Sequence, residues 1–82
     1  MLEATIFVTL KETVSDPQGL TIQHALRSLD YQEVEGVRFG KLLKVRLNLK
    51  DKKVAQAKVE EMCKKLLANP IIEEYVFQIN ER

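Results

Sequence analysis

The order of extended and helical segments predicts an α+β domain, a two-layer sandwich related to the ferredoxin-like arrangement. Three stretches alternate apolar with polar residues, as half-buried strands do, and the two stretches between them repeat apolar residues at helical spacing. We expect the order strand, helix, strand (bent or a hairpin), helix, strand, with both helices on one face of an antiparallel sheet. The 82 residues contain no flexible linker, so a single domain over residues 1–82 is expected.

The first strand is predicted over residues 4–10, because apolar residues alternate there among residue types that favour β structure. After residues 14–19, VSDPQG, the period becomes that of an amphipathic helix running to about Tyr31. Its apolar stripe would be Ile22, Ala25, Leu26 and Leu29. The DPQG sequence itself fits a type I turn, in which Asp16 bonds backbone amides and Pro17 presets φ.

Residues 37–49 keep one parity of apolar residues on both sides of Gly40, which favours one strand sharply bent at Gly40 over two short strands. Asp51 is expected to cap the second helix. The apolar stripe of that helix would be Ala55, Val59, Met62, Cys63 and Leu66. Asn69-Pro70 would end the helix, and the last strand is predicted over about residues 74–79.

Two helices on one face leave the other face of the sheet open. That face would expose Phe7 among polar and basic residues, namely Thr5, Thr9, Arg38, Lys44 and Arg46. Such a mixed surface suits a partly polar subunit contact. Because small domains often gain stability by oligomerisation, and disulfides and metal ligands look unavailable, we expect the chain to associate with itself.

The net charge and the single cysteine limit which partners and which cellular compartment we expect. Thirteen basic and twelve acidic residues give a net charge of +1, which provides no general attraction for nucleic acid or for an acidic membrane. No apolar run has the length of a membrane span. A lone cysteine is typical of the cytoplasm rather than of an oxidising compartment.

No catalytic constellation is visible. His24 points away from the apolar stripe of its helix and has no second ligand for a metal, and Cys63 lies where burial would raise its pKa. There is no phosphate-binding glycine loop, and the loop before the first helix lacks the Arg that acylphosphatase chemistry would need. The residues therefore identify no catalytic, cofactor-binding or metal site, and any activity of the isolated chain stays uncertain.

Four segments taken together, VTLKETVSDPQG, QHAL, VEGVRFGK and EMCKKLLANPIIEEY, resemble the PurS family, the small subunit of phosphoribosylformylglycinamidine (FGAM) synthase. The similarity covers nearly the whole chain. Ser15, where the family pattern has a bulkier apolar residue, is the one departure.

The resemblance implies a non-catalytic bridging subunit in de novo purine biosynthesis. Members of the family join a large PurL-type synthetase subunit, which uses ATP and Mg²⁺, to a PurQ-type glutaminase subunit that releases ammonia from glutamine. They also associate with themselves, so the resemblance implies a homodimer or a homotetramer. ATP and nucleotide binding would thus belong to the complex, a carbon–nitrogen ligase. Whether nucleotide also binds at an interface of this chain is left open, as is which face meets each partner.

The motifs also imply an interface. Its expected residues are Lys11, Asp16, Pro17, Gln18, Gly19, Arg38, Gly40, Lys41, Asn69, Pro70 and Glu73. The competing interpretation is a stand-alone ferredoxin-like regulatory module that binds a small effector at a dimer interface, which an analogy of fold alone does not exclude.

Overall fold

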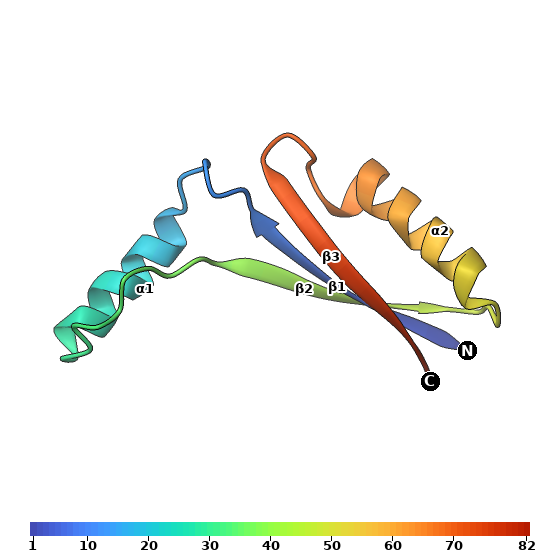
Figure 1. The fold of residues 1–82 in the computed structure, drawn as a ribbon, viewed down its shortest axis with the longest axis horizontal. Helices are drawn as coiled ribbons and strands as arrows, with labels where there is room; N and C mark the ends of the chain where they lie inside the picture. Colours follow the sequence, from blue (N-terminus) through green and yellow to red (C-terminus); the bar gives the residue numbers. More distant parts are fainter.

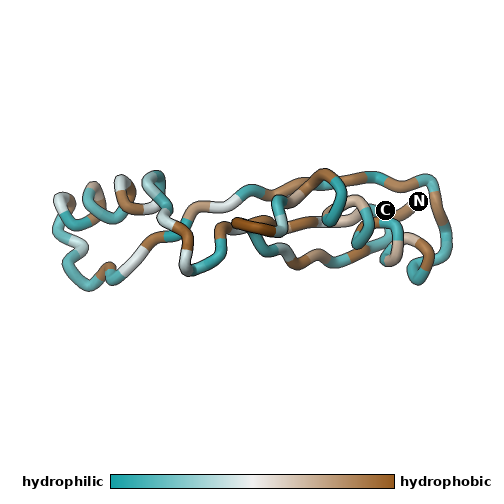
Figure 2. Tube along the Cα trace, turned by 90° about the horizontal axis from the view of Figure 1, so that it is seen from above, coloured by the Kyte–Doolittle hydropathy of each residue, from teal (hydrophilic) through white to brown (hydrophobic).

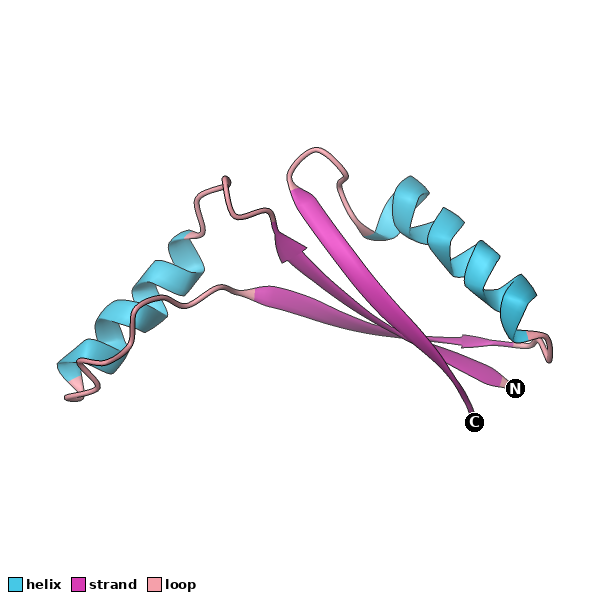
Figure 3. Ribbon diagram, viewed as in Figure 1, coloured by secondary structure: helices cyan, strands magenta, loops and turns pink.

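The computed structural model describes residues 1–82 and contains an antiparallel sheet of three strands in the order β2-β1-β3 (Figures 1 and 3). The elements follow one another as β1 (Leu2–Leu10), α1 (Pro17–Ser28), β2 (Gly40–Leu47), α2 (Lys52–Met62), a π-helical turn (Cys63–Leu67) and β3 (Glu73–Glu81). The α+β class and the order of elements are confirmed. β3 is longer at both ends than the predicted 74–79, because it pairs along the whole of β1.

The core lies between α2 and one face of the sheet. Alternate residues of β1 face α2 and are almost fully buried, namely Leu2, Ala4, Ile6 and Val8. Ala55, Val59 and Cys63 pack against them from the helical side. The Asp51 side chain accepts a hydrogen bond from the Lys53 amide and starts α2 as predicted.

The first helix does not cover the sheet, which corrects the expectation of two helices on one face. α1 lies beyond the end of the sheet that is opposite the two chain termini, and only α2 packs on a face (Figure 1). The molecule is consequently long and thin, 49 × 27 × 14 Å (Figure 2). The apolar stripe shows that α1 needs a cover, but periodicity carries no information about which surface supplies it.

Residues 29–39 return from the end of α1 to the sheet, and together with α1 they form a projection that we call the arm (residues 17–39). β2 begins only at Gly40, so the residues before it are neither the first half of a bent strand nor one strand of a hairpin. A Cβ atom at Gly40 would lie 2.8 Å from the Val8 carbonyl oxygen, which explains glycine where β2 meets β1. Arg38 consequently lies outside the open sheet face on which it was expected.

A π-helical turn shifts the face of the last helical turn. Leu66, expected in the core, is 83% exposed, whereas Leu67 packs against the core and Ala68 is buried. One extra residue in the turn rotates the following side chains by about 100°, so the strict 3.6-residue repeat predicts the wrong leucine.

The sheet face opposite α2 has no cover from this chain. Across the strands, Phe7 is paired with Leu42 on one side and Val76 on the other, and these side chains form an exposed apolar row. Lys44, Thr5 and Gln78 make the next row, and Arg46, Glu3 and Asn80 the row after it. The predicted mixture of apolar, polar and basic residues is therefore present on this open face, without Arg38.

Candidate functional site

The predicted interface residues, although scattered along the sequence, all lie near one end of the sheet, where the arm is attached (Figure 1). β1 ends there, at Leu10, and both neighbouring strands begin there, since Gly40 is paired with Thr9 and Glu73 with Leu10. The arm is attached at the same end. We call this region the junction.

Asp16 is the most enclosed polar residue of the junction, with 4% of its surface exposed. Its Oδ1 accepts the Gly19 amide at 3.0 Å, and its Oδ2 accepts the Phe39 amide at 2.6 Å. These bonds, that from Phe39 first, hold the pKa of the carboxyl below its usual value. Asp16 is the N-cap of α1 and Pro17 its first residue, so the predicted turn is in fact the first turn of the helix.

Arg38 makes the reciprocal contacts from the other side of the junction. Its Nη2 donates to the carbonyl oxygens of Lys11 and Val14, both at 2.9 Å. The guanidinium of the returning chain thus holds the loop that leads into α1, while Asp16 in that loop holds the returning chain. We call these two residues and their hydrogen bonds the clasp.

Gly19 permits the close approach of these two segments. A Cβ atom at this position would lie 2.2 Å from the Val37 carbonyl oxygen, so no other residue fits unless the backbone moves. Glycine is needed at this position because the two segments pass close to each other. It is not needed for an unusual backbone conformation, since no glycine in the chain has a positive φ.

A second set of contacts joins the loop after β1 to the turn before β3. Lys11 Nζ donates to the Pro70 carbonyl at 2.8 Å, and Glu73 Oε1 accepts the Asn69 amide at 2.7 Å. The other carboxylate oxygen of Glu73 lies 3.6 Å from Lys41 Nζ, which links β3 to β2 across the end of β1. Both carboxylate oxygens of Asp16 and both of Glu73 therefore already have a partner.

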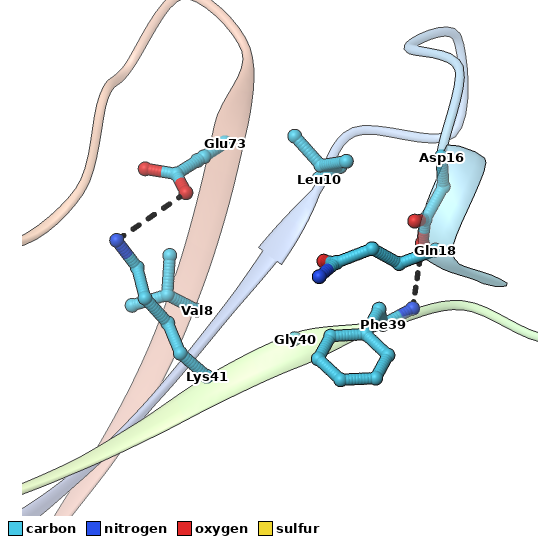
Figure 4. A pocket seen from close by; sticks show the side chains of 8 residues that line it. All are labelled: Val8, Leu10, Asp16, Gln18, Phe39, Gly40, Lys41 and Glu73. Atoms are coloured by element: carbon cyan, nitrogen blue, oxygen red, sulfur yellow. Dashed lines mark hydrogen bonds and ion pairs between the residues drawn. The ribbon is translucent and has the colours of Figure 1, made fainter.

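A hollow of about 290 Å³ opens between the clasp and the Lys41–Glu73 ion pair. It is lined by Val8, Leu10, Asp16, Gln18, Phe39, Gly40, Lys41 and Glu73 (Figure 4). Gln18 extends its amide from α1 into this hollow (Figure 4). The lining offers an amide, an ion pair and apolar surface, which suits contact with another molecule rather than bond-making chemistry.

The sequence interpretation missed the part that Phe39 plays, because an apolar residue between Arg38 and Gly40 looks like an ordinary strand position. Its backbone amide, not its side chain, completes the clasp. A side-chain pattern contains no signal for such a contact, although an acid at a helix N-cap and a glycine three residues later indicate part of it.

The two residues considered for chemistry lie elsewhere. Cys63, the first residue of the π-helical turn, is fully buried in the core, and burial, with Glu60 as a lesser cause, raises the pKa of its thiol. His24 is exposed on the arm. No cluster of three or more His, Cys, Asp or Glu residues could hold a metal ion, and no helix is long and apolar enough to cross a membrane.

Comparison with known proteins gives one consistent result over the whole chain. The PurS family model, described as phosphoribosylformylglycinamidine (FGAM) synthase, matches residues 3–81. The phosphoribosylformylglycinamidine synthase subunit PurS of Bacillus subtilis is 44% identical over 81 residues, which cover 99% of this chain and 95% of that protein. PurS of Methanocaldococcus jannaschii is 38% identical over 81 residues, covering 99% and 98%.

Solved structures agree in fold. The crystal structure of Methanocaldococcus jannaschii PurS, described as one of the subunits of formylglycinamide ribonucleotide amidotransferase in the purine biosynthetic pathway, superposes with a TM-score of 0.88 at 38% identity. That match covers 100% of this chain and 99% of the other. A chain of the PurLQS structure from Thermotoga maritima matches with a TM-score of 0.84 at 31% identity, over 98% and 99%.

A match of this extent in family model, sequence and fold, with the family's separate motifs meeting at one junction, establishes that the chain belongs to the PurS family of FGAM synthase.

Proposed function

We propose that this chain is the non-catalytic bridging subunit of FGAM synthase in de novo purine biosynthesis, and that it holds a PurL-type synthetase subunit and a PurQ-type glutaminase subunit in one complex. The Thermotoga maritima relative belongs to a structure described as PurLQS, and it matches this chain over nearly its whole length. The complex would work in the cytoplasm, as the single free cysteine suggests.

The convergence of the motif residues on the junction is the observation that carries this proposal. They build a hydrogen-bonded surface in which each charged group has a protein partner, and they include no nucleophile with a base beside it. A rigid surface of this kind suits docking, and we assign the synthetase subunit to it. Asp16 to Gly19 present the start of α1, and Arg38 and Lys41 flank it.

Chemistry in the complex would belong to the other subunits. ATP, Mg²⁺ and nucleotide are assigned to the synthetase and glutamine to the glutaminase, and this chain would bind none of them by itself. Ammonia protonates readily in water and then loses its nucleophilicity. A subunit that keeps the transfer path between the two enzymes closed and aligned would raise the rate without contributing a reacting group.

Self-association is the second part of the proposal. The open sheet face presents the apolar row of Phe7, Leu42 and Val76, and a second copy of this chain fits it in charge as well as in polarity. If two such faces pack with a twofold axis along β1, Leu42 meets Val76 of the other copy, Lys44 meets Gln78 and Arg46 meets Asn80. Lys44 and Arg46 then meet no like charge, and the two Glu3 carboxylates that face each other along the axis each have Arg46 of their own chain beside them. A dimer, or a tetramer built from two dimers, follows.

Reconstitution tests the proposed function. The purified chain is mixed with the synthetase and glutaminase subunits, and formation of FGAM is followed with glutamine or with ammonium chloride as the nitrogen source. We expect the chain to increase the glutamine-dependent rate strongly and to leave the ammonium-dependent rate nearly unchanged. A glutamine-dependent rate indifferent to the chain would overturn the bridging role and favour the regulatory-module alternative.

A further inference from the structure

The arm is joined to the rest of the molecule by two covalent connections, residues 11–16 and the Phe39–Gly40 link. No face of the sheet supports α1, so only the junction determines the direction in which the arm projects (Figure 1). Two unbraced connections would let the arm swing, because backbone torsions in short loops are soft.

The clasp braces the two connections crosswise. Asp16, in the first connection, accepts the amide of Phe39 in the second at 2.6 Å. Arg38, next to the second, donates to Lys11 and Val14 carbonyls of the first at 2.9 Å. All of these bonds have one charged partner, which makes them stronger than bonds between neutral groups. Rotation of the arm against the sheet would break bonds of both residues at once.

The identity of Asp16 supports this role. Capping α1 requires one acceptor atom, which Ser, Thr or Asn would also supply. Asp16 uses both carboxylate oxygens, one for the cap at Gly19 and the other for Phe39. The Asp51 side chain, in contrast, caps α2 through Oδ1 alone. The two N-caps of the chain therefore form a natural comparison between capping and bracing.

The length of the arm makes its direction important. α1 has 12 residues, so it is about 18 Å long, and a rotation of about 10° at the junction would displace its far end by about 3 Å. A displacement of this size is enough to separate groups that must be in contact across a protein interface.

We propose that Asp16 and Arg38 act as positioning residues, which fix the angle of the arm against the sheet so that the arm meets its partner in the complex in one orientation. The existence of the brace follows from the geometry of this chain, whereas its effect on the synthase rests on the proposed function.

The first experiment measures the angle between the arm and the sheet directly. Spin labels are attached at Ser28→Cys on the arm and Lys58→Cys on α2, both exposed positions, in chains diluted with unlabelled protein. Cys63 stays in place because it is buried. We expect a narrow distance distribution in the parent chain and a distribution at least twofold broader with Asp16→Asn or Arg38→Lys. Asp51→Asn and Arg82→Lys, both away from the junction, are the matched controls and should leave the width unchanged.

The second experiment measures FGAM formation at saturating concentrations of each variant. Asp16→Asn and Arg38→Lys should lower the maximal glutamine-dependent rate at least tenfold even at saturation, because a misdirected arm is not corrected by more protein. Unchanged distance widths in both variants would overturn the brace. Broader distributions with a normal maximal rate would overturn the role in assembly, and failure of the parent chain to stimulate the enzymes would instead count against the proposed function.

Discussion

Asp16 is the only charged residue that the fold buries, and its two hydrogen bonds predict how stability depends on pH. Because the pKa of the carboxyl is lowered in the folded chain, ionised Asp16 stabilises the fold at any pH above its unfolded value of about 4. That contribution is lost as the pH falls through the lower folded pKa.

The variant Asp16→Asn, which keeps the size of the side chain but cannot ionise, tests this pH dependence. We expect the unfolding free energy of the parent chain to exceed that of the variant by a constant amount between about pH 5 and pH 7, and the difference to shrink below about pH 4. Urea unfolding of the parent chain and of the variant, at one fixed chain concentration and at each pH, measures the two free energies of unfolding. If this difference did not change with pH, ionisation of Asp16 would not contribute to the free energy of unfolding.

Substitutions at Gly19 and Gly36 test whether the close contact between α1 and the returning chain matters for assembly. A side chain at Gly19 would collide with the Val37 carbonyl, whereas nothing lies within 4 Å of a Cβ atom at Gly36. We expect Gly19→Val to displace the returning chain and to weaken complex formation at least tenfold while the sheet core stays folded. Gly36→Val should assemble normally. Pull-down with the synthetase and the circular dichroism spectrum measure the two effects, and normal assembly of Gly19→Val would refute the docking role of this turn.

At the scale of elements, the sequence predicts what is encoded locally. The N-cap at Asp51, the alternation in β1 and the buried stripe of Ala55 and Val59 are local patterns, and each appears as expected. The position of α1 could not be predicted, because its apolar stripe is not buried against the sheet: only Gly19 of the helix is buried, and Leu29 just after it is exposed. The start of β2 at Gly40 was missed for a related reason, since residues 37–39 alternate like a strand but find no neighbour to pair with.

The convergence of the interface motifs could be predicted only in part. That DPQG leads into a helix is a local pattern and could be predicted. The pairing of Gly40 with Thr9 joins distant parts of the chain and could not. The crossed bonds of Asp16 and Arg38 join residues 23 or more positions apart in sequence. They arise only when the strand order brings both connections to one end of the sheet.

The π-helical turn gives a prediction of its own. Leu67→Ala should lower the free energy of unfolding by about 1–2 kcal/mol, because its half-buried side chain packs on the core. Leu66→Ala should change it by no more than about 0.5 kcal/mol, since that side chain is 83% exposed. Chemical denaturation of the two variants checks this. A regular α-helix to residue 67 would reverse the order.

At the scale of the whole molecule, the shape is difficult to reconcile with a solitary chain. Only 11 of 82 residues are buried, and α1 buries no residue except Gly19. A helix of 12 residues with so little support is marginal in water. Although the clasp sets the direction of the arm, we expect contacts with other chains to stabilise the helical structure of α1 and to cover the open sheet face, so stability should rise with protein concentration.

Phe7→Lys tests which surface provides these contacts. Phe7 is 39% exposed on the open face, so a lysine there would place two like charges opposite each other in the proposed dimer, while the chain's own core, on the other side of the sheet, is untouched. We expect the dimer dissociation constant to rise at least 100-fold by analytical ultracentrifugation. Val54→Lys is the control, because Val54 is similarly exposed, at 42%, but lies on α2. If both variants dissociate alike, or neither does, the self-contact lies elsewhere, and the arm becomes the next surface to test.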